Sequence, residues 1–112
     1  MLQDVFNTIA EHLMRQKRRS GVEDAKHGFQ CRYRAPNGDR CAVGCLMKDE
    51  FYTSECEGKI LSQALPRKVV AASIGLPGLP DDLYRLLRDC QELHDFTHPD
   101  LWASTLTLYA RL

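Results

Sequence analysis

The predicted fold depends on residues 29–46, FQCRYRAPNGDRCAVGCL. Within this stretch, residues 35–39 (APNGD) form a strong turn signal, because proline presets φ near about −65° and glycine tolerates a positive φ. A loop of this kind, closed by a glycine bulge, joins two antiparallel strands. The resulting register places Arg34 opposite Arg40.

The two faces of this predicted hairpin differ in chemistry. One face is nearly all apolar and carries Phe29, Cys31, Tyr33, Ala35, Cys41, Val43 and Cys45. The opposite face carries Gln30, Arg32, Arg34, Arg40, Ala42 and Gly44. A one-residue slip of either strand would mix the two sets, so the alternation supports this pairing. Because an isolated hairpin is only marginally stable, we expect helices to cover its apolar face.

Hydrophobic periodicity and helix-boundary signals predict these covering helices. They span residues 2–19, 54–65, 66–73, 80–96 and 99–111. Helix 54–65 begins with a capping box of Ser54 and Glu57, and Pro66 ends it. The sequence therefore predicts one α+β domain over residues 1–112, in which a two-stranded antiparallel hairpin at 29–46 packs against four to five α-helices.

Composition excludes several classes of protein. An apolar content of 44% with 27% charged residues is typical of a globular chain and excludes a disordered one. No apolar run approaches the roughly 20 residues that a membrane span needs, and the first residues lack the pattern of a secretory signal. We therefore expect a cytoplasmic protein. Its five cysteines, an odd number, do not indicate a disulfide framework.

Charge is balanced overall but distributed unevenly. Residues 1–48 hold nine Lys/Arg and five Asp/Glu, whereas residues 49–112 hold six and ten. The two halves can attract one another within the fold or between copies in a homo-oligomer; a mixed, solvated surface is the alternative. The basic run at residues 15–19 has no interleaved aromatic residues and fits the C-terminal end of a helix, so nucleic acid is not expected as a partner.

The arginine face is the first candidate site. Arg34 and Arg40 are like charges directly opposite each other, which destabilises a strand pair unless something offsets the repulsion. An external anion can do so, either the carboxylates of a partner protein or a phosphate-bearing ligand. The predicted contact residues are Arg32, Arg34, Arg40, Tyr33, Tyr52 and Asp95. The alternative is internal pairing, with Asp49, Glu50 or Asp95 as the partner.

The cysteines allow two further interpretations. Cys31, Cys41, Cys45 and His94 are a candidate ligand set for structural zinc, although their spacing lacks the usual CxxC pair. Cys41, His94 and Asp95 are the residue types of a thiol enzyme. Adjacent residues on a helix point about 100° apart, so we expect Asp95 to orient the His94 ring poorly. The alternative, which we favour, is free cysteines packed as small hydrophobic residues, with no cofactor and no catalysis.

The chain resembles a family of small, largely uncharacterised proteins encoded by bacteriophages and prophages. The shared residues are Cys31, Tyr33, Arg34, Pro36, Gly38, Cys41, Ala42, Val43, Gly44, Cys45 and Leu46, then Asp49, Glu50 and Tyr52, and finally Leu93, His94, Asp95 and Trp102. Members commonly have glycine where this chain has Ala35. The resemblance covers most of the chain and implies a phage-related context without an established activity.

Phage accessory proteins often bind and block host machinery, including defence systems, or sequester signalling nucleotides. The resemblance therefore implies a location in the cytoplasm of a host bacterium. Our leading prediction is a non-enzymatic binding protein that inhibits or modulates a host protein through its arginine face. The alternatives are a protein that binds a nucleotide or phosphate, a zinc module and a thiol enzyme.

Overall fold

Four α-helices and one two-stranded antiparallel hairpin form the regular structure of residues 1–110, the part of the chain that this computed structural model describes. In chain order they are α1 (Leu2–Gln16), β1 (Gly21–Asp24), β2 (Gly28–Cys31), α2 (Ala64–Ile74), α3 (Asp81–Phe96) and α4 (Trp102–Ala110). Single 3₁₀ turns lie at Gly44–Leu46, Ser54–Cys56 and Pro99–Leu101. The predicted α+β class is confirmed.

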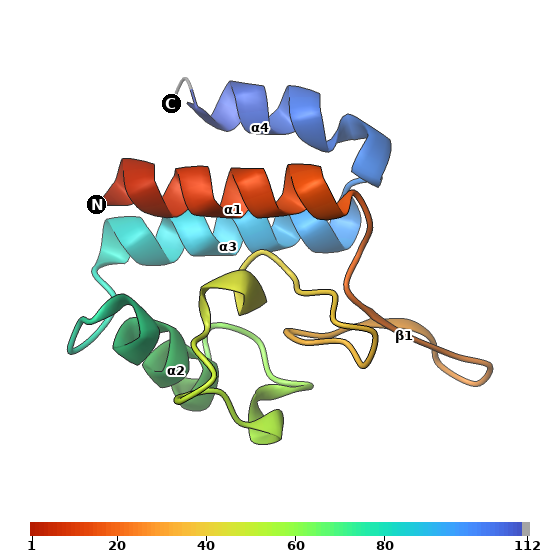
Figure 1. Cartoon of the computed structure of the whole chain (residues 1–112), viewed down its shortest axis with the longest axis horizontal. Helices are drawn as coiled ribbons and strands as arrows, with labels where there is room; N and C mark the ends of the chain where they lie inside the picture. The colour runs from red at the N-terminus through yellow and green to blue at the C-terminus, as the bar shows by residue number, and fades with distance from the viewer. Residues whose placement is uncertain (111–112) are drawn as a thin grey trace.

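Three of the helices form one layer. α1 packs against both α3 and α4, and α4 runs antiparallel to α3 after a short connection (Figure 1). α2 and the long connections lie on the other side of α3, and the hairpin projects from one end of the molecule (Figure 1). Ile9 on α1, Leu87 on α3 and Trp102 on α4 are fully buried, so part of the core lies between these three helices.

The hairpin lies earlier in the chain than predicted. Its strands are β1 and β2, with Gly21 opposite Cys31 and Asp24 opposite Gly28, whereas the prediction placed both strands within residues 29–46. Residues 23–29 are exposed, so these strands lack the alternation of apolar and polar residues from which a half-buried strand can be predicted. Phe29, expected on a buried face, is also exposed.

The predicted turn at residues 35–39 is present, although no strand ladder extends from it. The N–H of Gly38 donates to the carbonyl of Ala35 (3.0 Å), and the N–H of Ala35 donates to the carbonyl of Asp39 (2.9 Å). Arg34 and Arg40 form a single isolated antiparallel bridge, in the predicted register. The chain after this bridge enters the core, where residues 41–44 are all buried, so it cannot alternate as a half-buried strand would.

The end of α1 holds this turn in place. α1 stops at Gln16, three residues before the predicted end, because Lys17 adopts a left-handed conformation with φ of 56°. The reversal directs Arg18 to Asp39, with two hydrogen bonds of 2.6 and 2.8 Å. Gln16 also accepts a hydrogen bond from the backbone N–H of Arg40 and donates one to its carbonyl.

The helix expected at 54–65 does not form. Within residues 54–63 only the turn Ser54–Cys56 is helical, and its capping side chain is that of Thr53, which accepts from the N–H of Glu55. Gly58 then adopts a φ of 80°, which ends the helical path. Pro66 does not separate two helices but lies in the first turn of α2, where its missing N–H costs nothing. The predicted end of the last helix, residue 111, lies outside the described residues.

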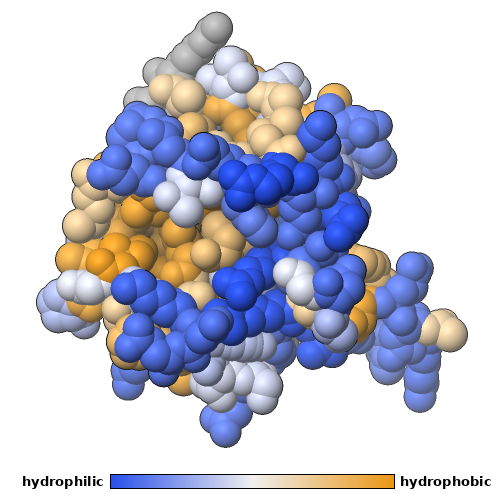
Figure 2. Space-filling view, in the orientation of Figure 1, coloured by the Kyte–Doolittle hydropathy of each residue, from blue (hydrophilic) through white to orange (hydrophobic). Residues whose placement is uncertain are grey.

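Surface hydropathy does not identify a binding face. Figure 2 shows hydrophilic residues in a band across the middle of the face in view, with hydrophobic residues gathered beside it. Among the described residues, no helix combines the length and the apolar composition needed to cross a membrane. A candidate site therefore has to be built from individual side chains.

Candidate functional site

Arg34 and Arg40 converge on the carboxylate of Asp49. One terminal nitrogen of the Arg34 guanidinium lies 2.8 Å from Asp49 Oδ1, and one of Arg40 lies 3.8 Å from the same oxygen. The side chain of Asp49 is 86% exposed. The two arginines are therefore paired within the chain, which was the alternative to an external anion. One exposed carboxylate is shared by two guanidinium groups.

The two arginines differ in how firmly they are fixed. The Arg34 side chain is only 21% exposed. It donates to the carbonyl of Met47 at 2.8 Å and lies over the Tyr52 ring, with 4.3 Å between the guanidinium carbon and the ring centroid. Its Nε is buried without a partner among the described residues. Arg40 is 37% exposed, so its guanidinium is the more accessible of the pair.

Glu57 organises the backbone beneath this pair, a role that the sequence did not reveal. Its Oε1 accepts from the N–H of Tyr33 (2.8 Å), and its Oε2 accepts from the N–H of Arg34 (3.0 Å) and the hydroxyl of Tyr52 (2.6 Å). Partial burial and the carboxylate of Glu57 raise the pKa of Tyr52 to about 12. Glu57 therefore orders both the arginine bridge and the aromatic ring that supports Arg34.

The other predicted contact residues lie elsewhere. The Tyr33 side chain is buried and donates to the carbonyl of Lys59 at 2.6 Å, so it cannot contact a partner. Arg32 and Asp95 line a separate cavity of about 220 Å³. The three arginines thus do not form one face: Arg34 and Arg40 act together, and Arg32 does not join them.

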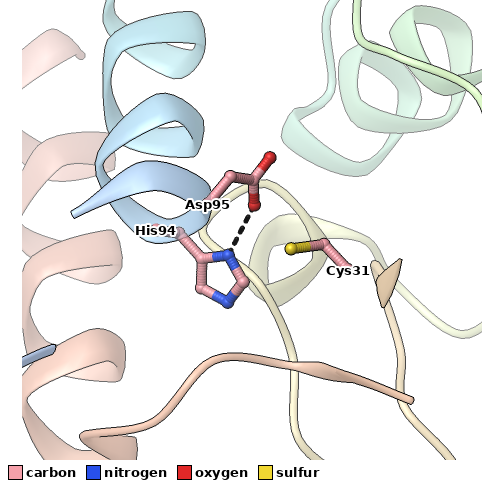
Figure 3. A group of neighbouring side chains, drawn as sticks. All are labelled: Cys31, His94 and Asp95. Carbon is pink, nitrogen blue, oxygen red and sulfur yellow. Dashed lines mark hydrogen bonds and ion pairs between the residues drawn. The ribbon is translucent and has the colours of Figure 1, made fainter. Parts of the chain in front are cut away.

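Cys31, His94 and Asp95 form a second cluster (Figure 3), and two of its members, Cys31 and Asp95, line that cavity. The Nδ1 of His94 lies 2.7 Å from Asp95 Oδ1. The backbone N–H of Ser20 donates to Nε2 of His94 at 2.8 Å. Because a backbone amide can only donate, Nε2 carries no proton, and Nδ1–H donates to Asp95. The expectation that adjacent residues would pair poorly was wrong, because the Asp95 side chain turns back onto the ring (Figure 3).

This arrangement does not fit the predicted zinc site. Of the four predicted ligands, only Cys31 and His94 come together among the described residues, with Asp95 as the third member. Cys41 accepts from the N–H of Gly44 and Cys45 donates to the carbonyl of Ala42, so both are engaged within their own turn. A metal at Nδ1 of His94 would require a proton on Nε2, which faces the N–H of Ser20.

The cluster is also poorly suited to thiol catalysis. Both ring nitrogens of His94 are occupied, so neither can take a proton from a thiol. Burial raises the pKa of the fully buried Cys41 thiol. Burial, and then the charge and hydrogen bond of Asp95, raise the pKa of Cys31 to about 12.

We expect Cys31 to react slowly with iodoacetamide at neutral pH. A pKa of about 12 leaves a thiolate fraction about a thousandfold below that of an ordinary thiol. Mass spectrometry of alkylated peptides from native protein should show little modification of Cys31, with urea-unfolded protein as the control. Rapid labelling of native Cys31 at neutral pH would contradict this assignment.

No family model, curated protein or solved structure matches the chain. The candidate sites therefore stand on their own geometry.

Proposed function

We propose that this protein is a small non-enzymatic binding protein that holds an acidic surface of a partner protein against Arg34 and Arg40. The observation that carries the proposal is the shared carboxylate of Asp49. A carboxylate already occupies the place where the guanidinium groups meet, so the geometry accepts that chemical group. Asp49 pairs closely with Arg34, at 2.8 Å, and only loosely with Arg40, at 3.8 Å, so the Arg40 guanidinium can take a further carboxylate.

Asp49 is a weak competitor for this place. Its side chain is almost entirely in water, where an ion pair is screened and contributes at most about 1 kcal/mol. A carboxylate from a partner can join it or displace it without breaking a buried contact. Arg34 is already held by Met47 and Tyr52, so little conformational freedom is lost on binding.

The resemblance to phage-encoded proteins supports the biological context. Within that context we propose that the partner is a host protein, for example of a defence system, and that binding inhibits or modulates it in the host cytoplasm. The second candidate ligand is a phosphate group, which two converging guanidinium groups can also bind.

Charge reversal at Arg40 tests the proposal. A fluorescent glutamate-rich peptide is titrated with protein at low and high salt, and fluorescence anisotropy reports binding. We expect Arg40→Glu to weaken binding by about tenfold or more, because it removes one of two converging charges and adds a repulsion. Arg88→Glu, at an exposed arginine on α3, is the matched control and should have a much smaller effect.

The outcomes separate the two ligand classes. Wild-type binding that weakens with salt and is lost in Arg40→Glu supports an acidic protein surface. Displacement of the peptide by inorganic pyrophosphate, but not by free glutamate at the same concentration, assigns the site to a phosphate ligand instead. Equal effects of Arg40→Glu and Arg88→Glu would remove the pair from the binding site.

A further inference from the structure

The cavity beside the Cys31 cluster has features that the proposed function does not use. It measures about 220 Å³ and opens between the end of β2, the segment after Glu57 and the last turns of α3. It is lined by Cys31, Arg32, Tyr33, Cys41, Glu57, Gly58, Lys59, Ile60, Leu61, Gln91 and Asp95. Its walls are thus partly apolar, with charged groups among them.

Asp95 is a fixed acceptor in this cavity. Gln91 Oε1 accepts from the N–H of Val43 (3.0 Å), and Gln91 Nε2 donates to Asp95 Oδ1 (2.9 Å). His94, itself held by the N–H of Ser20, donates to the same oxygen. Two side chains, each anchored to a backbone amide, therefore hold one carboxylate oxygen.

The other oxygen of Asp95, Oδ2, is the one available to a ligand. It receives no N–H or O–H donor from residues 1–110, and the side chain is 24% exposed. The Cys31 thiol, a weak donor, is the one further group that hydrogen-bonds to the Asp95 carboxylate within this part of the chain. Because the carboxylate is held by groups that cannot move easily, it is preorganised to accept a hydrogen bond from a cation.

Arg32 supplies the opposite charge. Arg32 is half-buried, lines the cavity and forms no ion pair within the described part of the chain. The remaining charged groups are engaged elsewhere: Glu57 accepts from two backbone amides and a tyrosine hydroxyl, and the ammonium of Lys59 donates to the carbonyl of Glu55. Among residues 1–110, Asp95 Oδ2 thus lacks an N–H or O–H donor, Arg32 lacks an ion-pair partner, and no ion pair joins the two side chains.

We propose that this cavity binds a small zwitterion of the amino-acid class. The ligand's ammonium group donates to Asp95 Oδ2, and its carboxylate lies against the guanidinium of Arg32. A volume of about 220 Å³ equals that of roughly seven water molecules in the liquid, which suits a ligand of about five to eight non-hydrogen atoms. Ile60 and Leu61 offer apolar contact to the methylene groups between the two charges.

The experiment uses a series of amino acids whose charges are increasingly far apart. Glycine, β-alanine, γ-aminobutyrate and δ-aminovalerate are titrated into the full-length protein, and NMR chemical-shift changes report affinity. Butylamine and butyrate, which carry one charge each, are the ligand controls. We expect at least one zwitterion to bind about tenfold or more tightly than either control, since only a zwitterion satisfies both charged groups.

Two variants test the residues. Asp95→Asn keeps an oxygen that can accept from Gln91 and His94 but removes the charge, and Arg32→Gln removes the positive end. Each should weaken zwitterion binding about tenfold or more, whereas Asp100→Asn and Arg88→Gln, at exposed positions elsewhere, should not. If Asp95→Asn fails to fold by circular dichroism, Arg32→Gln decides alone.

Three results would overturn the proposal: no zwitterion binds, butylamine binds as tightly as the best zwitterion, or binding survives Arg32→Gln. None of them bears on Arg34 and Arg40, whose test uses a different probe and different variants.

Discussion

Alanine in place of Gly44 is expected to destabilise the protein by about 3 kcal/mol or more. A Cβ atom at this position would overlap the carbonyl oxygen of Tyr33 and lie 2.7 Å from its carbonyl carbon. Both atoms are backbone, so no side-chain rotation relieves the overlap. Tyr33 is in turn held by Glu57 and Lys59, and the adjacent bridge of Arg34 and Arg40 would shift with it.

Urea unfolding followed by circular dichroism measures this effect as a lower midpoint. Gly78→Ala is the matched control, because a Cβ there meets nothing within 4 Å and the backbone has no positive φ. It should be neutral or slightly stabilising, since alanine restricts the unfolded chain. A Gly44→Ala protein that unfolds at the wild-type midpoint would show that the chain does not pass this close to Tyr33.

Leucine in place of His94 should cost about 2–4 kcal/mol of folding stability. His94 is fully buried and stacks on Trp102, with 5.6 Å between ring centroids. Leucine fills much of the same volume but leaves the N–H of Ser20 buried without an acceptor and removes a donor from Asp95. The loss should therefore arise from unsatisfied polar groups more than from lost packing.

His27→Leu provides the comparison, because His27 is exposed and its one partner within residues 1–110 is exposed Asp24. We expect its unfolding midpoint in urea to change little. His94→Gln should recover part of the loss, since its side-chain oxygen can take the place of Nε2 as an acceptor for Ser20. Equal midpoints for His94→Leu and His27→Leu would disprove the role assigned to the buried ring.

Local signals made part of this structure predictable. The turn at residues 35–39 and the Arg34–Arg40 register follow from proline and glycine at fixed positions, which act over a few residues. α1 and α3 follow from apolar residues at helical spacing. The sequence also predicts Asp49 as one of three possible internal partners of the arginines.

Long-range contacts determine what the sequence did not reveal. The pair of exposed Arg18 and buried Asp39 joins residues 21 positions apart, and the bond from Ser20 to His94 joins residues 74 apart. Neither leaves a periodic signature, because each depends on where separate elements pack. Glu57 fits the pattern of a capping box, which predicts the start of a helix and not the hydrogen bond that it accepts from Arg34. The positive φ of the next residue, Gly58, ends the helical path.

If Asp49 occupies the place of a partner's carboxylate, the substitution Asp49→Asn should open that place to a ligand. Removing an exposed competitor worth up to about 1 kcal/mol should tighten binding of the glutamate-rich peptide by about twofold to fivefold. Asp100→Asn makes the same change in net charge at another exposed carboxylate and is the control. We expect only Asp49→Asn, and not Asp100→Asn, to bind the glutamate-rich peptide more tightly than the wild-type protein does. Unchanged or weaker binding, or the same gain in Asp100→Asn, would contradict this expectation.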